Sequence, residues 1–243
     1  MNLKNQPIAV VTGVARGIGR YSAEQLIRYG AKVYGVDVRN ADIQGMTFFN
    51  CDIRDEKGIE CLFEKISKQE NRIDWLINCA GIICYKELDS IKKLSVSEWR
   101  EVIDVNLTGA FVVAKYAIPL LEKSDCGNIV NLSSDKVCHP DIGTAPYAVS
   151  KAGIEMLNRI LAVELLAKKI RVNTIALSSV NTDFIKDYVH NDDRFNKMMI
   201  ETDKRMPYGI IEPKDVFDAI WFVLSNPKIV GQKILIDSGV LLQ

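Results

Sequence analysis

A glycine-rich turn between an apolar run and an amphipathic stretch constrains this chain more than any other feature of its sequence. Residues 8–12 have the β-branched composition of a buried strand, and glycines follow at positions 13, 17 and 19. Glycine lets the backbone turn tightly and approach a phosphate, and a helix beginning there offers free N–H groups and the positive end of its dipole. A strand, a glycine turn and a helix in this order predict a dinucleotide site, with a flexible turn as the alternative interpretation.

The same alternation of strand and helix continues to the end of the chain. Short β-branched runs alternate with longer stretches of helical periodicity, which is typical of a parallel sheet covered by helices on both faces. The predicted strands lie at residues 8–12, 32–37, 46–51, 74–78, 127–132, 170–177 and 232–237. The predicted helices lie at residues 17–29, 55–70, 96–121, 146–168 and 213–225. We therefore expect one domain over residues 1–243, with a doubly wound, Rossmann-type, seven-stranded parallel sheet.

Composition and charge argue against several classes of protein. The 243 residues are 48% hydrophobic, enough for a large core, and the 31 basic residues balance the 31 acidic ones. The N-terminal segment lacks the apolar core of a signal peptide, and no uncharged apolar run is long enough to span a bilayer. The six cysteines form no CxxC pair and no cluster of zinc spacing. We expect a cytoplasmic protein with free thiols, no metal, and no nucleic-acid or membrane partner.

An acidic residue, Asp37, ends the second predicted strand. Its carboxylate can accept hydrogen bonds from the adenosine ribose hydroxyls and would repel a 2′-phosphate. Arg16 and Arg39 act in the opposite direction, since either guanidinium could reach such a phosphate. We expect a carboxylate acceptor at the ribose to influence the choice of cofactor more than two flexible arginines do, so the sequence favours NAD over NADP.

Tyr147 and Lys151 lie four residues apart on a predicted helix, so their side chains share one face. A free tyrosine has a pKa of about 10 and is a poor base at neutral pH. A nearby ammonium favours the phenolate and lowers the pKa of the tyrosine, and it can also bind the nicotinamide ribose. Ser134, at the end of the fifth strand, can bond a substrate oxygen that changes between hydroxyl and carbonyl. Each residue alone could be structural; together they predict proton transfer coupled to hydride transfer.

The joint pattern resembles the short-chain dehydrogenase/reductase family. The resemblance extends from the first strand to residues 231–239, and it is carried by the glycine spacing, the segment Asn-Cys-Ala-Gly at 78–81, Asn106, Ser134, Tyr147 and Lys151. It implies an enzyme that interconverts a secondary alcohol and a ketone, with Tyr147 moving the proton while the hydride moves to or from the nicotinamide. It also implies that Asn106 holds a water molecule that relays protons from Lys151.

The resemblance implies a wider cofactor site as well. The residues that match cofactor-contacting positions are Gly13, Arg16, Gly17, Ile18, Gly19, Asp37, Asp52, Ile53, Asn78, Ala80, Gly81, Tyr147, Lys151, Val180 and Thr182. The pair at 52–53 matches the adenine contacts, the segment at 78–81 runs along the adenosine ribose, and the loop at 180–182 holds the carboxamide. The family also implies a homotetramer, or a homodimer, with the helices at 96–121 and 146–168 in one interface.

The chain departs from the family pattern at two places. Cys79 stands where the family usually has asparagine, and Leu177 and Ser178 replace the proline and glycine usually found after the sixth strand. Because a residue other than glycine restricts the backbone beside the nicotinamide, the loop that carries Val180 and Thr182 can sit differently from its usual place.

The substrate side of the sequence leaves alternatives open. Residues 183–209 form a long connection with aromatic residues and methionines among many charges, which suits either a substrate lid or a surface helix. His139 could be a substrate partner or a structural residue. The stretch at 133–143 resembles 2,3-dihydro-2,3-dihydroxybenzoate dehydrogenases, although Asp141 replaces their basic residue, and the general layout is similar to 3-oxoacyl-carrier-protein reductases. The substrate is of a 3-oxoacyl or a cyclic dihydrodiol type; a non-catalytic, dinucleotide-binding redox sensor is the alternative function.

Overall fold

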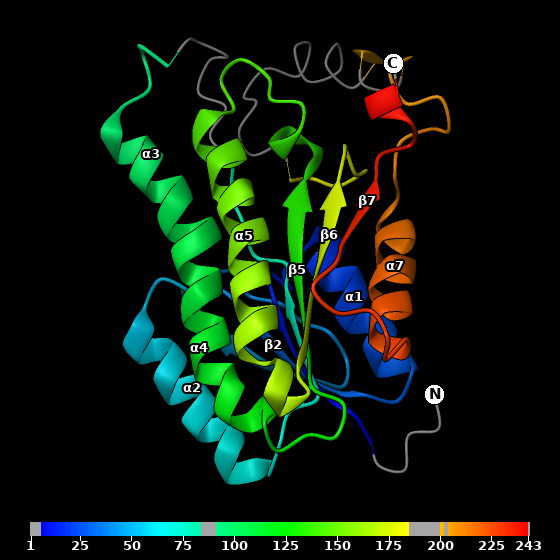
Figure 1. Cartoon of the computed structure of the whole chain (residues 1–243). Coiled ribbons are helices and arrows are strands. Elements are labelled where there is room, and N and C mark those ends of the chain that lie inside the picture. Colours follow the sequence, from blue (N-terminus) through cyan, green and yellow to red (C-terminus); the bar gives the residue numbers. More distant parts are fainter. Residues whose placement is uncertain (1–5, 84–90, 185–199, 202–203, 243) are drawn as a thin grey trace.

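Seven parallel strands form one sheet in the order β3-β2-β1-β4-β5-β6-β7 (Figure 1). The computed structural model describes residues 6–83, 91–184, 200–201 and 204–242. The strands are β1 Ile8–Thr12, β2 Lys32–Asp37, β3 Met46–Asn50, β4 Trp75–Asn78, β5 Asn128–Ser134, β6 Arg171–Leu177 and β7 Lys233–Ile236. The chain order reverses between β1 and β4, and open α/β sheets bind ligands at this switch point. The predicted doubly wound sheet is confirmed.

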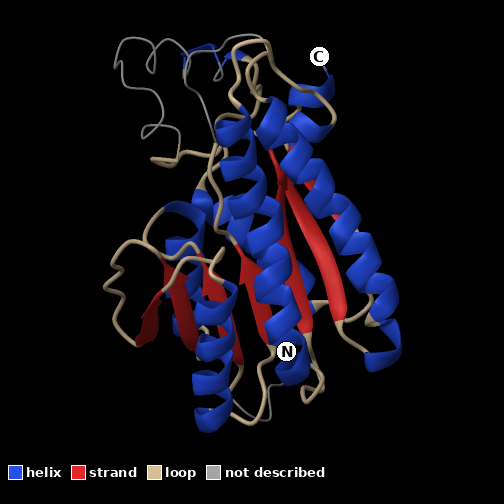
Figure 2. Ribbon diagram, turned by 90° about the vertical axis from the view of Figure 1, so that its left-hand side faces the viewer, coloured by secondary structure: helices blue, strands red, loops and turns tan. Residues whose placement is uncertain are grey.

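Helices cover both faces of the twisted sheet (Figures 1 and 2). They are α1 Gly17–Arg28, α2 Glu56–Gln69, α3 Val96–Ile103, α4 Ala110–Leu121, α5 Ala145–Glu164 and α7 Pro213–Ser225. Side chains alternate across β1, so that Val10 packs with α2, α4 and α5 on one face while Val11 packs with α1 and α7 on the other. Every residue of β1 is buried, as expected for a strand covered on both faces.

The ends of α1 and α5 show how local sequence shapes this fold. Gly30 has φ +85° and stops α1: its N–H donates to Ile27 O, and the next N–H, of Ala31, donates to Leu26 O. The helix predicted at 146–168 ends earlier, at Glu164, and is followed by a short 3-10 turn. Apolar periodicity continues past the last true α-helical turn, so it overestimated the length of the helix.

The helix predicted at 96–121 is continuous along the chain but not uniform in geometry. A π-helical segment, Asp104–Gly109, separates α3 from α4. By length and composition the stretch Val96–Leu121 could cross a membrane, with a mean hydropathy of 1.3 in its most apolar window. In this fold α4 packs against α2 and against β4, and 44% of that window is buried inside the protein, as in a core helix.

Candidate active site

The glycine turn between β1 and α1 forms one wall of a pocket at the carboxyl ends of the central strands. Gly13 has φ +75°, and a Cβ atom there would lie 2.8 Å from the backbone nitrogen of Ala80. A Cβ atom on Gly19 would overlap the carbonyl oxygen of Gly13. The turn therefore requires glycine, and it leaves the first turn of α1 facing the pocket, where helix N–H groups suit a phosphate.

Two carboxylates mark the end of the pocket next to β2 and β3. Asp37 Oδ2 accepts the N–H of Ala15 at 2.9 Å, and Asp37 Oδ1 accepts the N–H of Arg39 at 2.9 Å. Asp52 is held by the guanidinium of Arg54, with Nη2 at 2.6 Å from Oδ2, and this pairing lowers the pKa of the Asp52 carboxyl below its usual range. Both aspartates therefore present fixed acceptors.

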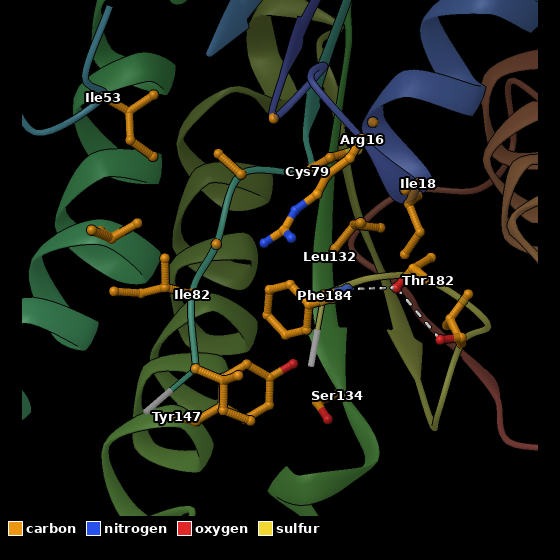
Figure 3. Close-up of a pocket in the computed structure, with 18 of the residues that line it drawn as sticks. Arg16, Ile18, Ile53, Cys79, Ile82, Leu132, Ser134, Tyr147, Thr182 and Phe184 are labelled. Carbon is orange, nitrogen blue, oxygen red and sulfur yellow. Dashed lines mark hydrogen bonds between the residues drawn. The ribbon is translucent and has the colours of Figure 1, made fainter. Parts of the chain in front are cut away.

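Nearly all of the residues predicted from the sequence line this one pocket (Figure 3). They are Gly13, Arg16, Gly17, Ile18, Gly19, Asp37, Asp52, Ile53, Ala80, Gly81, Ser134, Tyr147, Lys151, Val180 and Thr182. Asn78, Asn106 and His139 are not among the pocket residues. The Asn78 side-chain amide donates to Asn131 Oδ1 at 2.9 Å and connects β4 to β5, and its contact with the cofactor stays a prediction.

Tyr147 and Lys151 face the pocket from the first half of α5. Lys151 Nζ lies 5.6 Å from the centroid of the Tyr147 ring and donates to the Leu132 carbonyl at 3.0 Å. Burial lowers the pKa of Lys151 to about 8. The structure therefore places a cation beside the phenol, as the spacing of the two residues indicates.

Cys79 lines the pocket beside this lysine. Burial raises the pKa of the Cys79 thiol to about 12, an effect that the nearby Lys151 ammonium opposes only in part. The thiol is therefore neutral at physiological pH. Where the family usually places an amide, this chain gives Lys151 an apolar neighbour with weak hydrogen-bonding capacity.

Asn106 lies in the π-helical segment, and its side chain bonds the backbone of Ile82, which lines one wall of the pocket. Its Oδ1 accepts the N–H of Ile82 at 2.8 Å, and its Nδ2 donates to the Ile82 carbonyl at 2.9 Å and to Ser150 Oγ at 3.0 Å. The side chain thus fixes the backbone of the segment that follows β4. A π-helical turn at such a position is common near functional sites, but helical periodicity alone could not predict it.

Four consecutive polar residues, 133–136, line the pocket at and directly after the end of β5. Ser134 Oγ donates to Asp135 Oδ1 at 3.1 Å and accepts the N–H of Lys136 at 3.2 Å. Asp135 and Lys136 both line the pocket, and neither was predicted to belong to the site. The only signal in the sequence was a charged pair directly after Ser134.

The loop after β6 crosses from the glycine turn to Tyr147. Val180 pairs with Ile211, and Thr182 lies against Gly17, where a Cβ atom would be 3.3 Å from Thr182 Cγ2. Arg16 Nη1 donates to the carbonyl of residue 183 at 3.1 Å. The loop therefore reaches the pocket although it lacks the usual proline and glycine.

Phe184 follows in this loop and lines the pocket. Its ring centroid lies 6.4 Å from that of Tyr147, and Figure 3 shows it between Arg16 and Tyr147. Most of the predicted lid at 183–209 lies outside the described residues, which exclude 185–199 and 202–203. His139 is exposed, and its backbone N–H donates to the Asp135 carbonyl at 2.8 Å.

Known proteins resemble this chain over almost its full length. A family described as enoyl-(acyl carrier protein) reductase matches residues 13–241. Human 3-oxoacyl-[acyl-carrier-protein] reductase is 29% identical over 97% of this chain and 98% of its own length. Ligand-free aldohexose dehydrogenase from Thermoplasma acidophilum has a TM-score of 0.91 at 27% identity, covering 98% of this chain and 95% of its own. ElxO with NADP bound has a TM-score of 0.88 at 24% identity, covering 98% and 100%, a likeness of fold alone.

Proposed function

The chain belongs to the short-chain dehydrogenase/reductase family of nicotinamide-dependent oxidoreductases, and we propose that it uses NAD to interconvert a secondary alcohol and a ketone. One observation carries the proposal. Ser134, Tyr147 and Lys151 converge on the pocket whose far end holds the glycine turn and Asp37. A dinucleotide that extends from Asp37 past the glycine turn would end beside Tyr147.

The residues of the pocket fit such a cofactor. The glycine turn leaves no room for side chains where a pyrophosphate would approach, and the N-terminus of α1 faces that space. The Asp37 carboxylate is fixed by two backbone N–H groups in a position suited to accept ribose hydroxyls, which supports NAD. Lys151 would bind the second ribose. The bound nicotinamide would supply or accept the hydride at its C4 atom.

Tyr147 would move the proton. In the direction of oxidation, the phenolate of Tyr147 takes the hydroxyl proton of the alcohol while Ser134 bonds the same oxygen. The Lys151 ammonium, 5.6 Å from the phenol ring centroid, favours the phenolate over the neutral phenol. Asn106 acts indirectly, because its side chain holds the backbone of Ile82 on the opposite wall of the pocket. The chain's own residues thus provide an acceptor, an orienting hydroxyl and a stabilising cation.

A 3-oxoacyl compound is the substrate class that we favour. The human relative of similar length is named as a 3-oxoacyl-[acyl-carrier-protein] reductase. Lys136 pairs with Asp141 at 2.7 Å, so its ammonium is already neutralised and is poorly placed to bind the carboxylate of a cyclic dihydrodiol. The partner is then a small molecule.

We also propose that the protein is cytoplasmic and forms a homotetramer. Large apolar side chains are exposed on α4 and α5, among them Phe111, Met156 and Val163. Burial of such a surface is favourable, and the two helices are those predicted for an interface.

Replacement of the proposed proton carrier tests the function. We expect Tyr147→Phe to lower kcat at least about 100-fold, because general acid–base catalysis contributes about 10²–10⁴-fold. Turnover of 3-oxoacyl esters is followed by absorbance of the reduced cofactor, and NAD binding is measured by calorimetry. Tyr208→Phe is a matched control, since Tyr208 is 89% exposed and outside the pocket. A variant that keeps full turnover would refute the proposal, and a wild type that binds NAD without turning over any carbonyl compound would favour a redox sensor.

A further inference from the structure

We propose that Asp135 is a positioning residue for Ser134, and that it fixes the direction of the Ser134 hydrogen bond so that the site binds an alcohol in preference to the matching ketone. The proposal rests on the oxidoreductase function proposed above. Asp135 follows Ser134 at the end of β5 and lines the same pocket. It is 2% exposed, which is unusual for a carboxylate.

The hydrogen bonds around Ser134 have only one consistent direction. Its Oγ lies 3.1 Å from Asp135 Oδ1 and 3.2 Å from the backbone nitrogen of Lys136. An ionised carboxylate can only accept, and a backbone N–H can only donate. The hydroxyl proton of Ser134 therefore points to Asp135, and one of its two lone pairs accepts from Lys136.

A substrate thus meets the remaining lone pair of Ser134, which is an acceptor. The O–H of an alcohol can donate to this lone pair directly. The oxygen of a ketone has no proton to offer, so Ser134 can bond it only after its hydroxyl turns away from Asp135. The alcohol therefore binds without any change in Ser134, whereas the ketone requires the Ser134 hydroxyl to turn.

Turning the hydroxyl is costly because the Asp135 carboxylate has few alternatives. Its Oδ2 atom is buried and accepts no hydrogen bond from the part of the chain that the structure describes. Lys136 Nζ lies 3.8 Å from this Oδ2 but only 2.7 Å from Asp141 Oδ2, so its ammonium is directed mainly to Asp141. Without Ser134, the buried carboxylate would keep no hydrogen bond from the described residues, and a buried charge in that state is strongly disfavoured.

The consequence lies in ground-state binding. Tight binding of the alcohol lowers the KM of the alcohol, and weak binding of the ketone raises the KM of the ketone. The equilibrium of the reaction in solution does not change, because no enzyme can alter it. During oxidation, Ser134 must turn towards the substrate oxygen as Tyr147 removes its proton. Asp135 opposes that turn, and its replacement should bring the affinities of the two forms closer together.

Binding of a matched pair of probes tests the direction of the effect. A 3-hydroxyacyl ester is titrated into enzyme saturated with NADH, and the matching 3-oxoacyl ester into enzyme saturated with NAD, so that neither complex can react. We expect calorimetry to give a Kd about tenfold lower for the alcohol in the wild type, and a ratio within about threefold in Asp135→Asn. Glu101→Gln is the matched control, because it removes a negative charge from another wall of the same pocket but leaves both the bond to Ser134 and the pair of Lys136 with Asp141. Equal affinities in the wild type, or the same loss of preference in both variants, would overturn the proposal.

A second measurement needs neither substrate nor turnover. In a double-mutant cycle, Ser134→Ala should raise the unfolding equilibrium constant about tenfold in the wild type, because it leaves the Asp135 carboxylate without its hydrogen bond. The same change should have less than about a threefold effect in Asp135→Asn. Additive effects would show that the two side chains are not coupled, whatever reaction the protein catalyses. Coupling in a protein without dehydrogenase activity would instead count against the proposed function and not against this bond.

Discussion

The ammonium of Lys151 is held inside the protein, bonded to the Leu132 carbonyl at 3.0 Å and next to the thiol of Cys79. Burial disfavours its charged form, whereas the proposed chemistry needs that charge beside Tyr147. The site therefore bears an electrostatic cost in the absence of cofactor, as is common where catalytic groups have shifted pKa values.

This cost should be visible in the pH dependence of stability. The pKa of Lys151 falls from 10.5 to about 8 on folding, so between these values the unfolded chain binds a proton that the native state has lost. The contribution of Lys151 to the free energy of unfolding should therefore rise as pH increases from 8 to 10.5, by up to about 3 kcal/mol at 1.36 kcal/mol per pKa unit. Cys79 acts in the opposite direction above pH 9, because its pKa rises from 9.0 to about 12 on folding and the thiol then ionises only in the unfolded chain. Comparison with a variant that lacks only Lys151 therefore isolates the lysine.

Urea unfolding of the cofactor-free protein at pH 7, 8, 9 and 10 measures this contribution. The wild type should gain stability over Lys151→Met across the series, because methionine has a similar length but cannot titrate. Parallel curves for the two proteins would mean that Lys151 keeps an ordinary pKa in the folded state.

Asp37 governs a second prediction, the choice of cofactor. Asp37→Ala should raise the ratio of kcat/KM for NADP to that for NAD by at least about tenfold, because it removes a charge that repels a 2′-phosphate. Arg39, which lines the same part of the pocket, would remain to attract that phosphate. Steady-state kinetics with both cofactors give the ratio.

Asp37→Asn provides the comparison for this change. An amide keeps an acceptor for the N–H of Ala15, which Asp37 Oδ2 now accepts at 2.9 Å, but carries no charge. A shift in both variants would assign the preference to charge, and a shift in Asp37→Ala alone would assign it to the position of the glycine turn. No shift in either variant would place the adenosine ribose elsewhere.

Among the elements, the bounds of the strands agree most closely with those predicted from the sequence. The run at 8–12 is a strand with the same bounds, because β-branched residues buried on both faces leave no other regular structure that suits them. The helix at 96–121 was correct in extent, but its π-helical segment was not foreseen. That segment is set by packing between distant residues: a Cβ atom on Gly109 would lie 2.7 Å from Ile53, and Asn106 bonds Ile82.

Helix α7 ends on a buried cation, which leads to a prediction for stability. Arg171 of β6 donates to the carbonyls of Val223 at 2.6 Å, of Leu224 at 2.9 Å and of Asn226 at 2.9 Å. A cation at a helix C-terminus satisfies carbonyls that have no partner in the helix and opposes the helix dipole. Burial lowers the pKa of Arg171, which nevertheless stays charged.

We expect Arg171→Met to lower the free energy of unfolding by about 2–4 kcal/mol, because it leaves buried carbonyl groups without donors. Chemical denaturation measures the change. Lys57→Met, at an exposed position of α2, is the matched control and should cost less than about 0.5 kcal/mol. Similar losses in the two variants would show that the contacts of Arg171 add nothing to stability.

For the molecule as a whole, the sequence located the pocket but not all of its parts. The glycine turn, Asp37, Ser134 and the pair on α5 could be predicted because each belongs to a short motif whose chemistry is local. Asp135 could not, since an aspartate after a strand is usually solvated, and only the packing of the whole fold buries this one.

Assembly is the last property to be argued at this scale. Met156 and Val163 lie about two helical turns apart on the same face of α5. They are 55% and 75% exposed, so a single chain leaves apolar surface in water. If α4 and α5 form an interface between copies, the double variant Met156→Lys, Val163→Lys places like charges on both sides of it and should yield a smaller species. Analytical ultracentrifugation at several concentrations gives the mass, and circular dichroism checks that the fold is kept. Ile91→Lys, at another exposed apolar residue, should leave the mass unchanged. A double variant with the mass of the wild type would exclude these helices from the interface.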